Sequence, residues 1–359
     1  MKKGFVLLLC CALLVTGSLI GCKKDPASKV LRLLTWEGYA PADQVAKFKQ
    51  ETGISVEVIT SSNEEMISKL RATRGGGFDL AQPSQDRVTA MVEQFGLYQP
   101  IDYSKVNIDQ IDPGMLAITK KYTEFKGQSY AVPHVFGTSG LIVNKTMAPE
   151  AKDYKDLLDP KYKGRVSYRM KRPILLAMGF SLGYDPFSLY TDRDAYQKYL
   201  DKIGDVLIKG KPVVRNYWEN GDTLRDSILS GEIWLAKGWE QQAWKLYKEN
   251  PNIDYIAPAS GALAWVDTFA IPARSENVEG AYQWINFVLR PENAAAFTNT
   301  ENYGTSSKDA IKFYNPEAAA NFARCFPPAV IAKMNWYPTV PPGLEEMEGR
   351  TMDRIRASN

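Results

Sequence analysis

Three tryptophans stand beside carboxylates in this sequence: Trp36 before Glu37, Trp239 before Glu240, and Trp265 two residues before Asp267. An aromatic face attracts a cation, and each such contact contributes about 0.5–2 kcal/mol once the cation is desolvated. A carboxylate neutralises the same charge. This combination suits an extended ligand with ammonium groups at its ends and methylenes between them. Asp267 is the strongest candidate for an ammonium partner.

The same tryptophans also have a purely structural interpretation. The chain contains eight Trp, and a large aromatic residue is most often buried in a core. Three of them beside acids at the ends of expected strands favour ligand contact over packing alone. The single histidine, His134, follows Pro133, and we expect it to be a satisfied structural residue rather than a catalytic base.

The elements that would position these residues alternate between strands and helices. The sequence predicts a strand at 30–34, a helix at 41–51 and a period-two strand at 54–59. A strand, a helix and a strand within about thirty residues indicate a βαβ unit with parallel strands. Trp36 and Tyr39 would then lie on a loop at the carboxyl end of the first strand, where open α/β sheets bind ligands.

The alternation continues along the chain. A helix is expected from Ser62 to the glycines at 75–77, where no Lys-Ser/Thr follows to suggest a phosphate loop. Further strands are expected at 78–81, 165–168, 213–214, 233–236 and 267–272, and further helices before 182–183 and at 222–229 and 279–289. We therefore predict an α/β fold.

Composition bounds the class of protein. With 359 residues, 24% charged and 45% hydrophobic, the chain is long enough for two lobes. Its formal charge of 44 − 41 = +3 gives no electrostatic reason to expect a nucleic-acid partner. One His and four Cys argue against a zinc site built on paired histidines and against a disulfide scaffold. No metal and no cofactor are expected.

The N-terminus is typical of an exported protein. Lys2 and Lys3 precede an apolar run from Phe5 to Ile20, which is short for a membrane span and typical of a signal peptide. The run ends in a Leu-Ile-Gly-Cys sequence at 19–22 that resembles the bacterial lipobox. We expect a signal peptide at 1–21, a lipid on Cys22 and a tether at 22–29, with ordinary cleavage nearby as the alternative.

Two consequences follow for the rest of the chain. Lipidation would anchor the protein to a membrane with its body in the periplasm. Cys325 would then have no partner in the mature chain, and we expect a small packed thiol there rather than a nucleophile.

Several short motifs follow one another between about residue 30 and about residue 310. They are TWEGY at 35–39, FKQETGISVE at 48–57, NE at 63–64, FDL at 78–80 with PS at 83–84, VP at 132–133, KYKG at 161–164, GE at 231–232 through GW at 238–239, WVDTFAIP at 265–272 and INFVLRP at 285–291. No single motif is decisive. Their order and spacing resemble the spermidine- and putrescine-binding receptors of bacterial ABC importers.

The resemblance implies a two-lobed periplasmic-binding-protein fold, type II-like, in which several crossing segments join the lobes and the ligand is held between them. Crossings are expected near 134–138, 264–267 and 304–307. The N-terminal lobe would comprise 30–136 plus 267–306, and the C-terminal lobe 137–266 plus 307–359. The implied partners are a polyamine and an inner-membrane ABC permease, and we expect a monomer.

The resemblance also implies site residues. Positions that match the family's ligand-contacting motifs are Trp36, Tyr39, Ser84, Trp239, Trp265, Asp267 and Tyr303. The neighbouring acids Glu37, Asp86 and Glu240 complete the predicted ligand-binding set. Packing is the alternative role for Tyr303, and capping of a helix that begins at Gln85 is the alternative for Ser84.

The sequence departs from the family in three places. Glu37 precedes Gly38, which displaces a carboxylate by one residue, and Gln85-Asp86 stands where spermidine-preferring relatives carry an aromatic residue. The segment 169–173 reads Arg-Met-Lys-Arg-Pro, where those relatives carry acids. Three cations facing a polyamine would repel it. We therefore favour a shorter diamine such as putrescine, or an altered ligand, over optimal spermidine recognition.

Other classes of function remain as alternatives. A glycosidase would need two carboxylates, for which Glu240 and Asp267 are a formal possibility. A serine hydrolase would need His134 as its base, but the chain has no Gly-x-Ser-x-Gly elbow. A receptor retuned to another cationic or small polar ligand, or a surface protein that grips a protein partner through the basic run at 169–172, is the remaining possibility.

Overall fold

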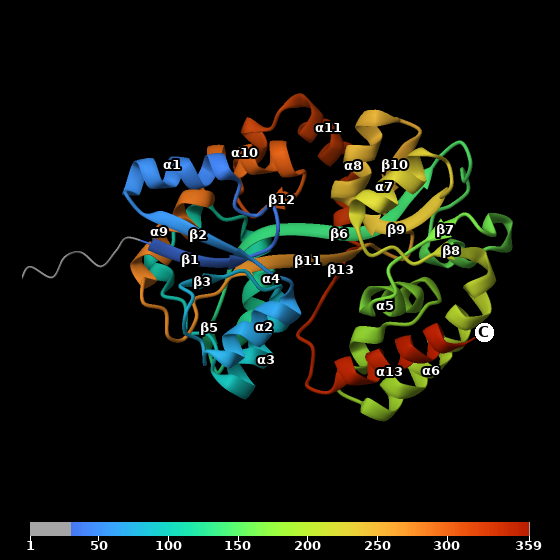
Figure 1. Cartoon of the computed structure of the whole chain (residues 1–359), viewed down its shortest axis with the longest axis horizontal. Helices are drawn as coiled ribbons and strands as arrows, with labels where there is room; N and C mark the ends of the chain where they lie inside the picture. Colours follow the sequence, from blue (N-terminus) through green and yellow to red (C-terminus); the bar gives the residue numbers. More distant parts are fainter. Residues whose placement is uncertain (1–29, 359) are drawn as a thin grey trace, which may run out of the picture.

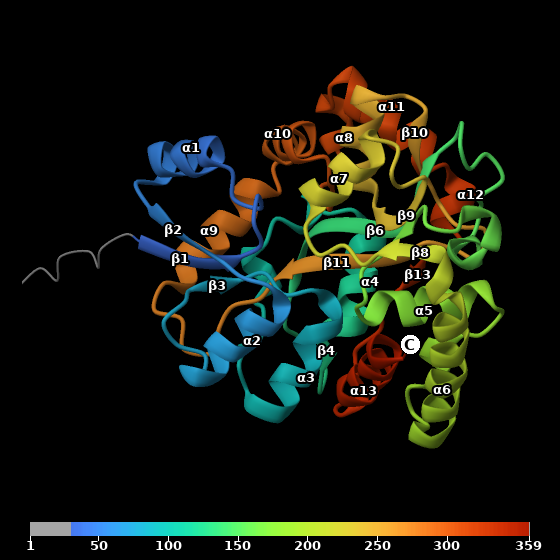
Figure 2. The same ribbon diagram turned by 45° about the vertical axis from the view of Figure 1, so that its right-hand side comes forward.

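The computed structural model describes residues 30–358. The predicted signal peptide at 1–21, the tether at 22–29 and the lipidation site Cys22 lie outside them. The described residues form two lobes that lie side by side (Figures 1 and 2). Within 30–358, no helix combines the length and apolar character needed to cross a membrane.

The first lobe contains a parallel sheet of three strands in the order β2-β1-β3. These are β1 (Val30–Thr35), β2 (Ser55–Thr60) and β3 (Leu80–Ala81). Helix α1 (Ala42–Thr52) ends at Gly53, whose φ of 72° is left-handed and therefore suits glycine. Helix α2 (Asn63–Ala72) begins with a capping box between Ser62 and Glu65. The predicted βαβ unit is confirmed.

A second sheet runs through both lobes. Its central strand is β6 (Val132–Asn144), which pairs antiparallel with β11 (Leu263–Phe269) and with β9 (Leu235–Trp239). In Figure 1, β6 and β11 extend side by side from the first lobe into the second. The other strands of this sheet are β7 (Val166–Ser167), β8 (Val214–Asn216), β10 (Ile253–Ile256), β12 (Gly304–Thr305) and β13 (Asn335–Trp336).

Helices cover both faces of this sheet in the second lobe. One core cluster joins Leu141, Leu235 and Leu263 of the sheet to side chains from three helices: α5 (Arg172–Ser181), α6 (Arg193–Gly210) and α13 (Leu344–Ala357). The neighbouring strand residues Ile142 and Ala236 belong to another cluster, with α7 (Gly221–Leu229), α8 (Glu240–Glu249) and α11 (Pro316–Cys325). Alternate strand residues point to opposite faces, so the two helix groups lie on opposite sides of the sheet.

The remaining elements complete the lobes. They are α3 (Gln85–Phe95), α4 (Pro113–Thr123), α9 (Val278–Val288), α10 (Pro291–Glu301), α12 (Pro328–Ile331), β4 (Glu124–Phe125) and β5 (Gln128–Ser129). Helix α9 buries Trp284 and Phe287 against Phe48 of α1, so its aromatic residues form a core face. The two-lobed α/β fold is confirmed, while the exact lobe boundaries stay a prediction.

One predicted strand was misplaced. The sequence predicts a strand at 267–272, but β11 begins at Leu263 and ends at Phe269. Trp265 therefore lies inside a strand and not at a strand end. The predicted crossings at 134–138, 264–267 and 304–307 fall on neighbouring strands, because Phe136 pairs with Gly304 and Gly137 pairs with Trp265.

Two residues that resemble reactive groups are structural. The ring of His134 is 3% exposed, stacks on Phe269 and lies 2.7 Å from Gln82 through Nδ1. Burial lowers the pKa of His134 to about 3, so this ring stays neutral. The buried thiol of Cys325 accepts a hydrogen bond from Trp244 Nε1 at 3.1 Å. The structure therefore confirms that the His134 ring has its contacts satisfied and that the Cys325 thiol is packed.

Candidate functional site

Asp267 occupies the point where three segments meet. It lies on β11, opposite Val135 of β6, and an isolated bridge brings Ser84 beside it from the segment after β3. Ser84 Oγ donates a hydrogen bond to Asp267 Oδ1 at 2.5 Å, and Tyr39 OH donates one to Oδ2 at 2.7 Å. The strand register therefore holds a carboxylate and two hydroxyls from distant parts of the chain in one place.

Aromatic side chains surround this carboxylate. Tyr39 lies 6.5 Å from Trp36 and 5.6 Å from Tyr303, and Tyr303 lies 5.9 Å from Trp265, measured between ring centroids. Tyr39 is buried, whereas Trp36, Trp265 and Tyr303 keep partial exposure. All four belong to one apolar cluster. We call Tyr39, Ser84, Trp265, Asp267 and Tyr303 the interlobe site.

Glu240 lies at the amino end of α8 and is almost fully buried. Its Oε2 accepts hydrogen bonds from Thr138 N at 2.8 Å and from Thr138 Oγ1 at 3.1 Å. Burial raises the pKa values of Tyr39 and Tyr303, and the charges of Asp267 and Glu240 raise them further. Glu240 therefore lies in the neighbourhood of the interlobe site, and its side chain is held by hydrogen bonds from the backbone and side chain of Thr138 on β6.

The carboxyl groups of Asp267 and Glu240 both have pKa values close to neutral pH. Burial raises the pKa of Asp267 to about 7, against the opposing hydrogen bonds from Ser84 and Tyr39. Burial also raises the pKa of Glu240 to about 8, against the hydrogen bonds from Thr138. A cation placed beside a carboxylate favours its ionised form. The site therefore has acids that an incoming ammonium would hold in the charged state.

A row of side chains leads from Asp267 along β6. Lys237 pairs with Leu141, Trp239 with Ser139, Trp265 with Gly137, and Asp267 with Val135. Directly paired strand residues share a face, and residues two apart on one strand do so as well. Lys237, Trp239, Trp265 and Asp267 therefore project from the same face of the sheet.

Trp239 lies farther along this row than the other aromatic residues. Its ring packs edge-on against Trp218 at 5.4 Å, and the guanidinium of Arg169 lies 5.4 Å from its centroid. Trp239 is the last residue of β9, close to the strand end that the sequence predicts. Trp239 therefore packs against Trp218 and also keeps part of its surface exposed.

Asp86 is engaged in an ion pair. Its Oδ2 lies 3.0 Å from Arg172 Nη1, and Arg172 Nε lies 3.1 Å from Glu348 Oε1. Asp86 is on α3, Arg172 on α5 and Glu348 on α13, and all three side chains are buried. This pair joins α3, beside the first lobe's sheet, to two helices of the second lobe. The predicted ligand contact of Asp86 stays a prediction.

The basic run at 169–172 does not present three free cations. Arg172 is held by Asp86 and Glu348, so it is not part of an exposed basic patch. Arg169 and Lys171 both lie 3.7 Å from Glu219. Arg169 also lies over the rings of Trp218 and Trp239, so it is the member of the run that approaches the row on β6.

Glu37, the remaining acid of the predicted ligand-binding set, is exposed in the turn after β1, and its ligand contact stays a prediction. Neighbouring Gly38 has a φ of 81° and lies against Glu301, whose Oε2 would be 3.0 Å from an added Cβ. The half-buried Glu301 has a pKa raised by burial. Glu301 was not among the predicted residues, and its distance in sequence from Gly38 gave no signal of this contact.

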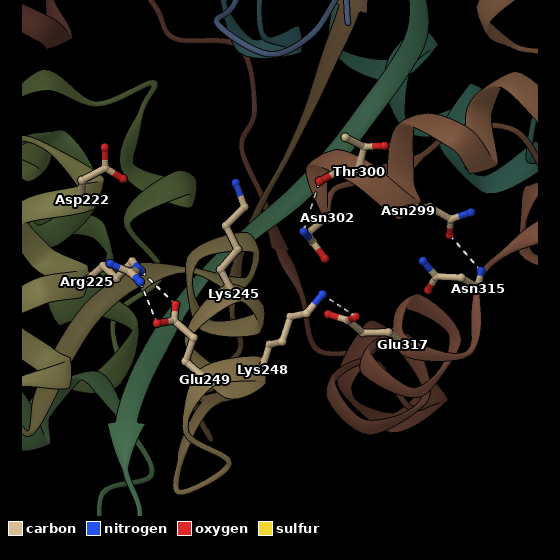
Figure 3. Close-up of a pocket in the computed structure, with 10 residues that line it drawn as sticks. All are labelled: Asp222, Arg225, Lys245, Lys248, Glu249, Asn299, Thr300, Asn302, Asn315 and Glu317. Carbon is tan, nitrogen blue, oxygen red and sulfur yellow. Dashed lines mark hydrogen bonds and ion pairs between the residues drawn. The ribbon is translucent and has the colours of Figure 1, made fainter. Parts of the chain in front are cut away.

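An open hollow of about 470 Å³ lies elsewhere, between α7 and α8 on one side and α10 and the start of α11 on the other (Figure 3). Its charged residues are largely paired, with Arg225 Nη2 at 2.6 Å from Glu249 and Lys248 Nζ at 2.9 Å from Glu317. The hollow is lined by none of the predicted ligand-binding residues. We attribute ligand chemistry to the interlobe site, because the carboxyl group of Asp267 is buried and has no cation beside it among residues 30–358.

Sequence reasoning missed two residues near the site. Thr138 anchors Glu240 through its backbone and side chain, and Lys237 projects on the same face as Asp267. Both depend on strand register between segments about a hundred residues apart. A single sequence shows alternation within one strand but not which residues of another strand lie opposite.

Comparisons with known proteins agree with this geometry. A family model described as bacterial extracellular solute-binding protein matches residues 43–324. The spermidine/putrescine-binding periplasmic protein of Escherichia coli (strain K12) is 32% identical over 324 residues, covering 89% of each chain. The putrescine-binding periplasmic protein PotF of the same strain is 28% identical over 369 residues, covering 96% of each chain.

A solved structure shows the same architecture. The spermidine/putrescine ABC transporter substrate-binding protein PotD from Streptococcus pneumoniae superposes with a TM-score of 0.76 and 25% identity, covering 91% of this chain and 98% of that chain. The match of the family model extends over most of the chain, from α1 to α11. The chain therefore belongs to the family of bacterial extracellular solute-binding proteins.

Proposed function

We propose that this protein is a lipid-anchored receptor that captures a polyamine, putrescine or spermidine, between its lobes and delivers it to an ABC importer. The observation that carries the proposal is the buried carboxylate of Asp267. Tyr39 donates a hydrogen bond to it and belongs to one aromatic cluster with Trp265 and Tyr303. Among residues 30–358, no cation lies beside this carboxylate. The relatives named for spermidine and putrescine support it.

Capture works by lobe closure. A ligand that contacts groups from both lobes stabilises the closed arrangement through its differential affinity for that state. Asp267 would neutralise one ammonium, and Trp265 and Tyr303 would cover the methylenes and offer their faces to the charge. The receptor acts as a monomer and without a cofactor, and we expect no chemical turnover of the bound polyamine.

The ligand is tested by mass spectrometry of small molecules released from the purified chain, followed by calorimetric titration with putrescine and spermidine. The proposal expects a polyamine in the released material and one binding site per chain, with putrescine bound at least as tightly as spermidine. Spermidine bound far more tightly than putrescine would overturn the preference for the shorter diamine. No binding of either compound would overturn the proposed ligand.

The anchor is tested separately. Cys22→Ser removes the thiol that would carry the lipid, so the variant should leave the membrane fraction while its polyamine affinity stays unchanged. Cys325→Ser is the matched control and should leave membrane association intact. Membrane association that survives Cys22→Ser would contradict lipidation at this residue.

A further inference from the structure

The row on β6 ends in two cations that the proposed function does not use. Lys237 is 7% exposed, and burial and the charge of Arg169 lower its pKa to about 7. No hydrogen bond or ion pair within 30–358 satisfies its amine. The Nε atom of Arg169 is also buried without a hydrogen-bond partner among these residues. Buried donors normally have an acceptor, so Arg169 Nε is an orphaned donor, and the amine of Lys237 has no protein partner among the described residues.

The two cations come from adjacent parallel strands. Strand β7 pairs with β9 through Val166 with Leu235 and Ser167 with Ala236. Arg169 follows the end of β7, and Lys237 is the middle residue of β9, directly after Ala236, the last residue that pairs with β7. The rings of Trp218 and Trp239 lie against Arg169, and Trp218 Nε1 donates to Lys237 O at 3.0 Å. We call Arg169, Lys237, Trp218 and Trp239 the cationic end.

The charges around the cationic end are nearly all positive. Glu219 is the acid that pairs with it, at 3.7 Å from both Arg169 and Lys171. The Glu219 side chain is 59% exposed, so solvent screens much of its charge. A second ammonium placed here would meet Arg169 and Lys237 without a buried carboxylate to neutralise it.

We infer that the interlobe site takes an ω-amino carboxylate, with its ammonium at Asp267 and its carboxylate at Arg169 and Lys237. This inference rests on the proposed receptor function and names a further class of ligand for the same site. A guanidinium with free N–H groups binds a carboxylate through charge-assisted hydrogen bonds. The ligand would supply the acceptors that Arg169 Nε and the Lys237 amine lack.

The geometry also bounds the length of this ligand. Arg169 lies over Trp239, which pairs with Ser139, whereas Asp267 pairs with Val135. Four residues along a strand span roughly 13 Å, whereas the six residues to Leu141, the partner of Lys237, span roughly 20 Å. The Lys237 side chain therefore has to extend toward Arg169, whose charge acts on it, to share one carboxylate. Two hydrogen bonds, each of about 3 Å, leave room for a chain of a few methylenes. 4-Aminobutyrate, 5-aminopentanoate and 6-aminohexanoate are therefore the probes.

The experiment titrates these three probes and putrescine into the full chain by calorimetry. The inference expects at least one amino carboxylate to bind at least as tightly as putrescine. Asp267→Asn should weaken both classes more than tenfold, because both place an ammonium there. Putrescine binding without any binding of the three probes would overturn the inference and leave the proposed function standing. No binding of either class would overturn both.

Variants of the cationic end give the second arm. Lys237→Met and Arg169→Gln should each weaken the bound amino carboxylate at least tenfold, while putrescine affinity stays equal or rises. Lys248→Met is the matched control, because Lys248 is an exposed lysine of the same lobe, and it should change neither affinity. Equal losses for both ligand classes in Lys237→Met would overturn the inference, since they would indicate a structural role.

Discussion

At the scale of single residues, Asp267 combines burial with hydrogen bonds that hold its orientation. Ser84 and Tyr39 each donate to one of its oxygens, so the carboxylate cannot turn away from the interlobe site. An ammonium that enters a desolvated site without a counterion loses about 2–5 kcal/mol relative to the paired state. The chemistry of capture is therefore concentrated in one side chain.

The first prediction is that Asp267→Asn weakens putrescine binding more than tenfold. Asparagine keeps the size of the side chain but lacks the charge that neutralises the ammonium. Calorimetric titration measures the change. Asp309→Asn, at an exposed acid that pairs with Lys312, is the control and should bind as the natural protein does. Unchanged affinity in Asp267→Asn would remove this residue from the site.

A second prediction concerns the pH dependence of binding. The pKa of Asp267 is raised to about 7 and that of Glu240 to about 8, so both are largely protonated at pH 6. Binding of an ammonium favours the ionised form, so putrescine affinity should rise from pH 6 to pH 8.5. The rise should be up to roughly tenfold per pH unit for each proton released.

Titrations in buffers of different ionisation enthalpy measure the protons released on binding. Release should be clear at pH 6 and much smaller at pH 8.5. A flat affinity over this range, with no proton released at pH 6, would show that neither carboxyl changes its ionisation on binding.

A third prediction concerns stability. The folded-state pKa of Asp267 lies above that of an unfolded aspartate because of burial. The stability that this group contributes is therefore fully present below the unfolded pKa of about 4 and is lost as the pH rises from there through about 7. The melting temperature of unliganded Asp267→Asn, which is neutral throughout, should be closest to that of the natural protein near pH 4 and should lie above it at pH 8.5. A lower Tm for the variant at pH 8.5 would contradict this sign.

At the scale of elements, α3 links the two lobes. Asp86 pairs with Arg172 of α5, and Gln85 Nε2 donates to Tyr337 O at 3.0 Å while its Oε1 accepts from Val266 N at 2.7 Å. Val340 N also donates to Asp86 O at 3.1 Å. These contacts tie the start of α3 to β11, to α5 and to the segment before α13.

A fourth prediction tests this link. Asp86→Asn removes the charge that faces Arg172 across the lobes, while Arg172 keeps Glu348. Because loss of a buried partner penalises the closed state, putrescine affinity should fall roughly tenfold. X-ray scattering should show a larger radius of gyration at the same putrescine concentration. Glu249→Gln is the control, since the Arg225–Glu249 pair joins α7 to α8 within one lobe.

Arg172→Gln separates a link between lobes from a direct ligand contact by Asp86. If Asp86 acts through the ion pair, this variant also weakens binding. If Asp86 contacts the ammonium itself, removal of Arg172 frees its carboxylate, and binding tightens. The second outcome would contradict the role that the structure indicates for Asp86.

Elements that are marked by local sequence patterns could be predicted, whereas strands without such a pattern could not. The strand β1, the helix α1 and the helix start at Ser62 follow from local periodicity and helix-start signals, which the structure confirms. The start of β11 at Leu263 and the full length of β6 were not predicted. Both strands are buried on two faces over most of their length, so they lack the alternation that marks a half-exposed strand.

At the scale of the whole molecule, two long strands carry the site between the lobes. Because β6 and β11 run side by side through both lobes, residues on one face of this pair form a continuous row. Asp267 and Trp265 could be predicted from motif and composition. Their alignment with Trp239 and Lys237 could not, because it depends on the pairing of β6 with β9.

The charges near the site also require the three-dimensional structure. From the sequence, the run at 169–172 predicts three like charges beside the ligand. In the structure, Arg172 is neutralised by Asp86 and Glu348, and Arg169 lies over two indole rings. Long-range ion pairs of this kind leave no mark in local sequence, because each partner lies on a different element.

The most direct test of the account is a crystal structure of the full chain with putrescine bound. The account predicts one ammonium within hydrogen-bonding distance of Asp267, with the methylenes against Trp265 and Tyr303. Putrescine found instead in the hollow between α8 and α10, with Asp267 still bonded only to Ser84 and Tyr39, would contradict it.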